Sequence, residues 1–518
     1  MASDNALAPA VSLADLLAGQ SVSTQHAALS LKGLSIDSRD IKPGYAFVAM
    51  AGVHYHGKTF IEQAISNGAL AVLIDKQDLP SLNQHYSVPL IGISALAKQL
   101  STIAGNFYSH PSRALPLIGV TGTNGKTSCV QLLAQAFALS SVPCGVLGTL
   151  GYGVANNSDS QVPIDFIATG MTTPDAIQTQ KLCAKLKSLK VETIAMEVSS
   201  HGLDQHRVAA LDINTAVFTN LSHDHLDYHH TMEAYARAKA KLFQMPSVTT
   251  AIINQDDQYA ARFVEGLAPE VALITYSVRD GAALFAQADA HFSLVEKRSQ
   301  GQLNSISIQS PEGLLVIETP LVGAFNISNL LAVIATLYSQ SICLDKLPDI
   351  IPKLHAVSGR MEAITNGLDL QVLVDFAHTP DALANVLQAL VDNHQGKLWC
   401  VFGCGGDRDR GKRSQMAQIA ERWADQVAVT SDNPRTESPV QIFADIEQGF
   451  SKPQEIIADR ASAIEYAIDQ AQPGDCILIA GKGHEDYQII GDKRIAFSDQ
   501  QHARFCLRRR ESRELADD

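Results

Sequence analysis

Short apolar runs alternate along the chain with stretches in which apolar residues recur every three or four positions. The first pattern is typical of buried parallel strands and the second of amphipathic helices. Near the N-terminus it predicts strands at 34–37, 45–50 and 69–75, with a helix at 59–68. Because the same alternation continues to the end of the chain, we expect an α/β fold built on parallel sheets.

Changes in this pattern divide the chain. A helix-like segment ends before Pro111, which disfavours helix in the residue that precedes it, and another strand–loop–helix series begins near Ser358. Between them, residues 283–324 alternate polar and apolar positions around SQGQ and SPEG turns, which indicates antiparallel hairpins added to a parallel sheet. We therefore expect domains at 1–111, 112–357 and 358–518.

The segment Leu115–Leu139 predicts a strand, a tight turn and a helix in direct succession. Gly122 and Gly125 allow backbone N–H groups in the turn to close on phosphate oxygens, and the start of the helix adds partial positive charge. Lys126 can then reach the outer phosphates, and the Thr127 hydroxyl can bind Mg²⁺. A glycine-rich turn without a ligand does not require Lys-Thr at its end, so the sequence favours nucleotide binding.

Two later strands of this region end in polar residues. Glu197 closes one apolar run, at the sheet edge where ligands collect, and its carboxylate can bind the Mg²⁺ of a nucleotide. The next strand opens into Asp224, His225 and Asp227, a set that favours a metal or phosphate site over a purely structural histidine. Helical spacing alone would place Lys239, farther along, on a solvated face.

Four strand ends of the last region bring polar side chains to one edge of a sheet, which predicts a ligand site. They carry His378, Arg408, residues 432–435 (DNPR) and residues 481–485 (GKGHE). The basic residues at 408–413 suit either a solvated loop or an anion site. Anion binding is favoured because glycines precede them at a strand end.

Composition narrows the functional classes. The 518 residues carry a formal net charge of −14, which opposes a general nucleic-acid role. We expect a cytoplasmic protein, because the sequence has neither a basic and apolar leader nor an apolar run of membrane-spanning length. Its eight cysteines are scattered and indicate buried, reduced thiols rather than a zinc site.

Motifs in a fixed order run through nearly the whole chain. They are DSR at 37–39, TGTNGKT at 121–127, MTTPD at 171–175, EVSSHGLDQHR at 197–207, DHLDYH at 224–229, FNISN at 325–329, GRME at 359–362, HTPDAL at 378–383, GCGGDRDRGKR at 403–413, DNPRTE at 432–437 and GKGHEDYQ at 481–488. In these motifs the chain resembles the Mur ligase family, and within it the branch that adds meso-2,6-diaminopimelate. The resemblance implies an N-terminal UDP-binding α/β unit, a central phosphate-loop domain and a C-terminal Rossmann-like domain.

The resemblance also implies an activity, that of an ATP-dependent ligase of peptidoglycan precursor synthesis. ATP would phosphorylate the γ-carboxylate of D-Glu in UDP-MurNAc-L-Ala-D-Glu, and the amine of meso-diaminopimelate would then displace phosphate from the acyl phosphate. The partners would be these small molecules, with Mg²⁺ as cofactor, and the enzyme is expected to be a monomer.

The family's functional residues carry over to matching positions of this sequence. The catalytic residues would be Lys126, Glu197, His225 and Lys239. The metal ligands would be Thr127, Glu197, His225 and Lys239 as a carbamate, with Lys239 rather than Lys241 the modified residue.

The substrate contacts implied by the resemblance fall into three sets. ATP would be bound by Gly122, Thr123, Asn124, Gly125, Lys126, Thr127, Ser128, Asn326 and Arg360. The UDP-MurNAc-dipeptide would be bound by Ser38, Thr172, Thr173, Ser199, Gln205 and Arg207. The amino acid would be bound by Arg408, Asp432, Asn433, Pro434, Arg435, Gly481 and Glu485.

Specificity for the amino acid is assigned to the DNPR motif. Meso-diaminopimelate differs from lysine by a carboxylate at its far end, which the planar guanidinium of Arg435 can hold with two hydrogen bonds. Asp432 and Glu485 would take the distal ammonium. The alternatives are a lysine-adding relative, a ligase like folylpolyglutamate synthetase, and a nucleotide-binding regulator without catalysis. Intact Lys126, Glu197, His225 and Lys239 oppose the last.

Overall fold

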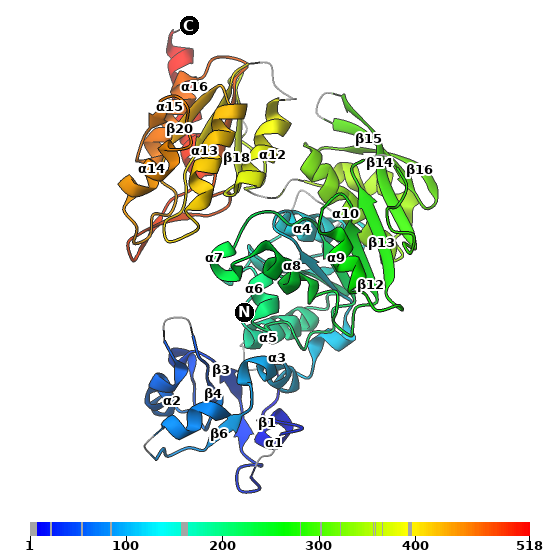
Figure 1. Ribbon diagram of the computed structural model, residues 1–518, viewed down its shortest axis with the longest axis vertical. Coiled ribbons are helices and arrows are strands. Elements are labelled where there is room, and N and C mark those ends of the chain that lie inside the picture. The colour runs from blue at the N-terminus through cyan, green and yellow to red at the C-terminus, as the bar shows by residue number, and fades with distance from the viewer. Residues whose placement is uncertain are drawn as a thin grey trace.

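The computed structural model describes residues 8–517 except 21–22, 53–54, 83–84, 157–163, 280, 301–302, 322, 356, 358, 365 and 392–395. The three larger of the five sheets in the described residues follow one another along the chain, and Figure 1 shows them as successive bodies with the largest sheet in the middle.

The N-terminal sheet has four parallel strands in the order β3-β4-β5-β6. Their bounds are β3 Gly33–Ser35, β4 Tyr45–Ala49, β5 Ala71–Asp75 and β6 Leu90–Ile93. The helices are α1 Leu13–Leu16, α2 Ile61–Ser66 and α3 Leu96–Phe107, and β1 Val11–Ser12 pairs with β2 Ser30–Leu31. The strands and the helix predicted in this region are all present.

The central sheet has ten strands in the order β16-β15-β14-β13-β12-β11-β7-β10-β8-β9. Neighbouring strands from β14 to β8 run parallel, whereas β15, β16 and β9 are antiparallel to their neighbours. The bounds are β7 Leu117–Thr121, β8 Cys144–Gly148, β9 Gly151–Ala155, β10 Thr193–Glu197, β11 Thr215–Phe218, β12 Thr250–Asn254, β13 Ala272–Ser277, β14 Ala290–Gln300, β15 Leu303–Ser310 and β16 Gly313–Thr319. The hairpins expected at 283–324 are therefore confirmed.

Helices cover both faces of this sheet, which explains why its parallel strands are apolar on both sides. They are α4 Lys126–Leu139, α5 Ala176–Ser188, α6 Ser200–Asp204, α7 Leu226–His229, α8 Met232–Ala240, α9 Ala260–Glu265, α10 Ala324–Ser339 and α11 Leu347–Ile350. One hydrophobic core joins α4 and α10 to the sheet, and a second joins α5, α8 and α9 to it.

The C-terminal sheet has six strands in the order β17-β18-β22-β19-β20-β21, parallel except for β17. The bounds are β17 Glu362–Ala363, β18 Gln371–Asp375, β19 Leu398–Phe402, β20 Gln426–Val429, β21 Glu455–Ile456 and β22 Cys476–Ala480, with a separate hairpin of β23 Tyr487–Ile490 and β24 Lys493–Ala496. The helices are α12 Pro380–Val391, α13 Gly411–Trp423, α14 Pro439–Glu447, α15 Arg460–Gln470 and α16 Asp499–Asp517.

This architecture confirms the predicted fold class, an α/β protein with an N-terminal unit, a mostly parallel central sheet and a Rossmann-like C-terminal sheet. The boundary expected at Ser358 lies outside the described residues. Among the helices of the described part of the chain, none is long and apolar enough to cross a membrane.

Candidate active site

The turn between β7 and α4 has the backbone that its glycines predict. Gly122 and Gly125 have φ values of 153° and 86°, and a Cβ on either would collide with a neighbouring side chain. On Gly122 it would lie 1.9 Å from Thr219 Oγ1, and on Gly125 it would lie 2.3 Å from Asn329 Oδ1. The tight turn therefore depends on glycine at both positions.

The amides of this turn divide into two groups. Those of Thr123 and Asn124 donate to the backbone oxygen and the side-chain oxygen of Asn220, at 2.8 and 2.9 Å. The amides of Lys126 and Thr127 open α4, where the helix itself provides no acceptor. The amides of Lys126 and Thr127 are therefore the ones at this turn that a bound anion could use without displacing an internal acceptor.

A half-buried lysine, Lys126, and a buried one, Lys239, converge on one carbonyl of the turn. Lys126 Nζ donates to the oxygens of Gly122 and Thr123, each at 2.7 Å, and Lys239 Nζ donates to the same Gly122 oxygen at 2.7 Å. Burial lowers the pKa of both amines, and the charge of Lys126 lowers the pKa of Lys239 further. Lys239 thus lies in the site, not on the solvated face that helical spacing suggested.

Lys241, two residues farther along, has a different environment. Its ammonium pairs with Asp204 Oδ1 at 2.7 Å, and both side chains are 41% exposed. This contrast supports the choice of Lys239 over Lys241 as the functional lysine of the helix.

Glu197 closes β10 beside the phosphate loop and is buried. Its Oε2 accepts from Thr127 Oγ1 at 3.0 Å, and the Thr149 amide donates to Oε1 at 2.8 Å. Thr149 Oγ1 also donates to Oε2, at 3.0 Å, and lies 3.0 Å from Thr172 Oγ1. The structure therefore brings together the hydroxyl and the carboxylate that the sequence assigned to Mg²⁺.

Residues expected to hold the dipeptide gather beyond Glu197. Thr173 Oγ1 donates to the Glu197 carbonyl and accepts from the Ser199 amide, each at 2.9 Å. Arg207 donates to the Thr173 carbonyl and to Gln205 Oε1, each at 2.6 Å. Five predicted residues, Thr172 included, thus form one continuous polar surface beside the phosphate loop.

Ser38 lies apart from this surface, in the N-terminal unit. It is buried and donates to Gln63 Oε1 at 2.7 Å. It lines a cavity of about 1100 Å³ that extends to Thr169, Met171 and Lys181 of the central unit. This cavity is large enough for a nucleotide sugar and ends next to the Thr172–Thr173 pair.

His225, the N-cap residue of α7, lies in a group of aromatic side chains. Its ring is 4.9 Å from that of His201 and 6.1 Å from that of Tyr235, on which Lys239 stacks at 4.5 Å. Burial lowers the pKa of His225 to about 4, although the carboxylate of Asp224, 3.5 Å away, opposes the shift. The ring is therefore neutral near pH 7, which is the form that binds a metal ion.

Asn326 lies in the first turn of α10 and Asn329 in the second, and both are buried. Asn329 is too far into the helix to cap it, so helix capping does not explain this residue. Asn329 Oδ1 instead faces Gly125 and lies 3.6 Å from Cys129 Sγ. Arg360 stacks on Phe376 with its guanidinium 4.5 Å from the ring centre.

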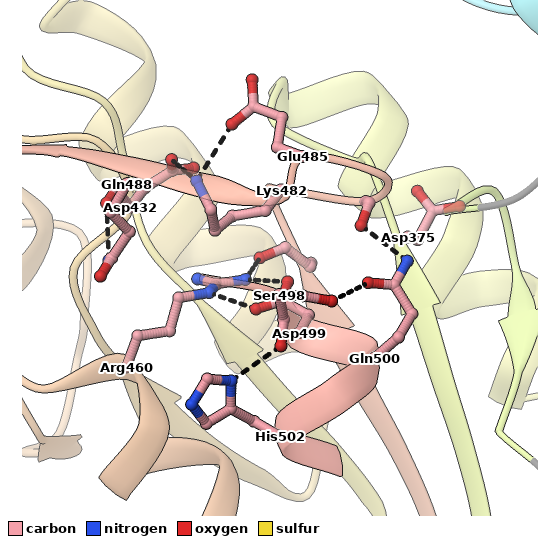
Figure 2. Close-up of polar contacts among 12 residues, drawn as sticks. Asp375, Asp432, Arg460, Lys482, Glu485, Gln488, Ser498, Asp499, Gln500 and His502 are labelled. Carbon is pink, nitrogen blue, oxygen red and sulfur yellow. Dashed lines mark hydrogen bonds and ion pairs between the residues drawn. The ribbon is translucent and has the colours of Figure 1, made fainter. Parts of the chain in front are cut away.

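The four predicted strand ends of the C-terminal sheet do meet at one edge, because β18, β19, β20 and β22 are parallel neighbours. Lys482 lies at the centre of the DNPR and GKGHE residues, between Asp432 and Glu485 (Figure 2). Its ammonium is 3.0 Å from Glu485 Oε2, 3.7 Å from Asp432 Oδ1 and 3.1 Å from Asn433 Oδ1. The two predicted acidic ligands thus already share a buried cation.

Arg435 has a left-handed backbone (φ 52°) and donates from Nη1 to the Gly406 carbonyl at 2.8 Å. Burial lowers the pKa of this guanidinium, and the nearby charge of Arg408 adds to the effect. Arg408 itself is exposed. The charge of Arg408 thus acts against that of Arg435, and an added carboxylate would relieve this repulsion.

The basic loop at 408–413 is only partly available as an anion site. Arg413 is fully buried and pairs with Glu437 and Asp445, each at 2.7 Å. Lys412 donates to the His378 carbonyl at 2.8 Å. The anion-site expectation is therefore wrong for Arg413, because folding pairs its charge with two carboxylates.

Two contacts join the C-terminal unit to the phosphate loop region. Asn124 Nδ2 donates to Asp381 Oδ2 at 3.2 Å, and His223 Nδ1 lies 3.6 Å from Asp409 Oδ2. Asp409 follows Arg408 directly, so these contacts bring the loop that carries Arg408 close to the phosphate-loop region.

A magnesium ion fits the residues beside the phosphate loop. Among the residues with described positions, no group of three or more His, Cys, Asp or Glu side chains could hold a metal. Mg²⁺ in nucleotide sites is commonly held by one or two protein oxygens together with phosphates and water. The Thr127 hydroxyl and Glu197 carboxylate supply such a pair.

Sequence reasoning missed two residues that organise the site. Thr149 follows β8 directly and holds Glu197 through both its amide and its hydroxyl. Its place after an apolar run was the available signal. Lys482 was part of a recognised motif, but only the fold shows that its ammonium joins Asp432 to Glu485.

Comparison with known proteins finds family matches in all three parts of the chain. Models of the Mur ligase family match as its catalytic domain over residues 30–108, its middle domain over 120–337 and its glutamate ligase domain over 359–483.

The chain is 46% identical over 471 residues to the UDP-N-acetylmuramoyl-L-alanyl-D-glutamate--2,6-diaminopimelate ligase of Ectopseudomonas mendocina, covering 90% of this chain and 93% of the relative. It is 45% identical over 486 residues to the ligase of the same name from Pseudomonas putida, covering 92% and 95%. A solved structure of such a ligase superposes with a TM-score of 0.67 at 36% identity, covering 97% of this chain and 99% of that one.

Proposed function

The chain belongs to the Mur ligase family, and from this premise we propose that it joins meso-2,6-diaminopimelate to UDP-N-acetylmuramoyl-L-alanyl-D-glutamate with cleavage of ATP. It is thus an ATP-dependent acid–amino-acid ligase of peptidoglycan precursor synthesis. The observation that supports the proposal is that the C-terminal unit contacts the region of the β7–α4 turn: Asn124 donates to Asp381, and His223 lies 3.6 Å from Asp409, the neighbour of Arg408.

In the first step the γ-carboxylate of D-Glu attacks the γ-phosphorus of ATP, and ADP leaves. The amides at the start of α4 and the ammonium of Lys126 bind the phosphate oxygens and stabilise the charge that moves with the phosphoryl group. Lys126 now bonds to the carbonyls of Gly122 and Thr123, so we infer that it exchanges these acceptors for phosphate. Thr127 and Glu197 would hold a magnesium ion, which would neutralise charge on the phosphates.

In the second step the amine of the amino acid attacks the acyl carbon, and phosphate leaves with the electrons of the C–O bond. The amine must reach this carbon in its uncharged form, and one further proton leaves its nitrogen to solvent as the amide forms. We assign to His225 and Lys239 a second position for a metal ion near the accepting carboxylate. This assignment rests on their grouping around Tyr235.

We also propose that Lys239 carries a carbamate in the active enzyme. Burial and the neighbouring charge of Lys126 lower the pKa of its amine well below the usual range, which favours the uncharged form. An uncharged amine adds CO₂ and releases a proton, which would convert the side chain into an anionic oxygen ligand. An anion there would also offset the charge of Lys126, which approaches the same Gly122 carbonyl.

The amino acid would lie at the C-terminal edge. Arg435 and Arg408 would bind the distal carboxylate, while Asp432 and Glu485 would bind the distal ammonium, with Asn433, Pro434 and Gly481 shaping the pocket. Lysine has the ammonium but lacks this carboxylate. We therefore expect the arginine pair to decide between the two amino acids.

Several wider features belong to the proposal. We divide the chain into domains at 1–111, 112–357 and 358–518, and expect the third to close on the second during turnover. Scattering profiles that superimpose with and without all ligands would contradict this closure.

We further propose a monomer, because one chain contains all the assigned site residues. A cytoplasmic location follows from the need for ATP and a UDP-sugar.

The direct test is to identify the product. The protein is incubated with ATP, Mg²⁺, UDP-MurNAc-L-Ala-D-Glu and meso-diaminopimelate, and the UDP-linked products are separated and weighed by mass spectrometry. A product heavier by one diaminopimelate residue, with one ADP per product, is expected. An unchanged UDP substrate together with ATP cleavage would contradict the proposal.

A further inference from the structure

Lys482 is a buried cation for which the two chemical steps above have no use. Its side chain is fully buried in the loop that follows β22, and its ammonium is close to the two carboxylates of Asp432 and Glu485. A buried lysine without partners would be costly, so these contacts fix where the ammonium lies.

The contacts of Lys482 distinguish the two oxygens of Glu485. Oε2 accepts from Lys482 Nζ at 3.0 Å and from Asn433 Nδ2 at 2.9 Å. Oε1 has only one long contact within the described part of the chain, with Tyr487 OH at 3.4 Å. Glu485 is therefore held through one oxygen and presents the other.

The amide of Asn433 is locked by the same arrangement. Its Oδ1 accepts from Lys482 Nζ at 3.1 Å and from the Ile489 amide at 2.9 Å, while its Nδ2 serves Glu485. The orientation of this side chain therefore depends on the lysine as well as on the carboxylate.

A second buried pair, Arg460 and Asp499, supports the loop that carries Lys482, and Figure 2 shows this pair beneath Lys482. Arg460 binds both oxygens of Asp499 at 2.7 Å and donates to the Ala480 carbonyl at 2.9 Å, directly before Gly481 and Lys482. Gln500 donates to the Gly483 carbonyl at 2.9 Å. The backbone of the lysine loop is thus fixed independently of the lysine side chain.

We propose that Lys482 is a positioning residue for the amino acid: it holds Glu485 and Asp432 so that together they accept the distal ammonium of the substrate. This inference rests on the proposed function. Two carboxylates and one lysine leave a single negative charge in excess, which one substrate ammonium neutralises. Without the lysine, Glu485 loses its anchor and the substrate ammonium can occupy the vacated place, which moves the reacting amine away from the acyl phosphate.

The test compares two amino acids that differ only in the distal amine, meso-diaminopimelate and L-2-aminopimelate. For each, kcat/KM is measured with the full-length wild type and with Lys482→Met, at saturating ATP and UDP-MurNAc-L-Ala-D-Glu. Where aminopimelate turns over too slowly, its inhibition constant against meso-diaminopimelate replaces kcat/KM. The wild-type preference for meso-diaminopimelate should fall by about 30-fold or more in the variant, because the lost interaction is a buried charge contact.

Lys482→Arg serves as the conservative control, since it keeps the buried charge. It should restore the preference to within about fivefold of wild type. If Lys482→Met does not accumulate as folded protein, Lys482→Gln is measured in the same way, because it retains a donor for Asn433.

An equal loss with both amino acids would indicate general damage and overturn the inference, as would an unchanged preference. A wild type that fails to use meso-diaminopimelate at all would instead contradict the proposed function, so the two failures are distinguishable.

Discussion

The phosphate-loop edge of the central sheet and the amino-acid edge of the C-terminal sheet are built alike, but their cations have different hydrogen-bond partners. Both lie at the carboxyl ends of parallel strands. At the first edge, Lys126 and Lys239 bond to a backbone carbonyl. At the second, Lys482 and Arg413 pair with carboxylates.

This difference matters for what each edge can do. A carbonyl is a neutral partner, so the charge of Lys126 is left for phosphate to take up. The cations Lys482 and Arg413 at the other edge are largely neutralised, and they hold ligands in position instead. Similar sheet edges can thus supply reactive charge in one case and fixed geometry in the other.

The largest effect is expected from removing the free charge at the first edge. Lys126→Ala should lower kcat/KM for ATP by about 10³-fold, because the developing phosphoryl charge loses its closest cation. Phosphate release measures the loss. A decrease of less than about tenfold would show that this lysine is as neutralised as Lys482 and would remove the contrast between the edges.

Lys239, in the last turn of α8, and Lys241, its C-cap residue, can be compared directly. Lys239→Ala should lower kcat by about 10²-fold through loss of the second ligand position, whereas Lys241→Ala should change kcat by less than about threefold because its pair with Asp204 is a surface one. The wild type should also lose activity in CO₂-free buffer and regain it with bicarbonate. Equal effects of the two substitutions would contradict the assignment of Lys239.

At the second edge, Arg435→Ala should mainly alter selection between amino acids. We expect KM for meso-diaminopimelate to rise by about 30-fold or more, while the low activity with L-lysine stays within about threefold, because only the distal carboxylate loses a partner. Steady-state kinetics with both amino acids measure this. Parallel losses would mean that Arg435 shapes the pocket without reading the carboxylate.

The smallest effect concerns stability. The hydrogen-bonded pair with Arg413 lowers the pKa of Glu437 from its ordinary value of 4.5 to about 2. The pair therefore contributes its full stabilisation above pH 4.5 and loses it as the pH falls toward 2. Glu437→Gln should lower the melting temperature by about 2–4 °C at pH 7. The difference from wild type should shrink at pH 3, and a constant difference would contradict a purely structural pair.

The sequence predicted the first edge better than the second for a physical reason. Gly122, Gly125 and Lys126 act through backbone geometry that a short motif determines, so the structure confirms the turn directly. Arg408 and Arg413, by contrast, look alike in sequence. Only tertiary packing buries one against Glu437 and Asp445 and leaves the other exposed.

Long-range partners also explain what was missed. Helical spacing suggested a solvated Lys239, but β7 and its turn bring a carbonyl to that face of α8. Thr149 likewise depends on β8 and β10, which are distant in sequence and adjacent in the sheet. Lys482, after β22, meets residues that follow β20, and β19 separates these two strands in the sheet. The fold class, which follows from repeated local patterns, needed no such information.

Phosphate release from ATP tests the central claim most directly. It is measured with UDP-MurNAc-L-Ala-D-Glu and either meso-diaminopimelate, L-lysine or no amino acid. We predict strong release with meso-diaminopimelate alone. Equal release with lysine would contradict the role of Arg435, and release that does not require the UDP substrate would contradict the ligase assignment itself.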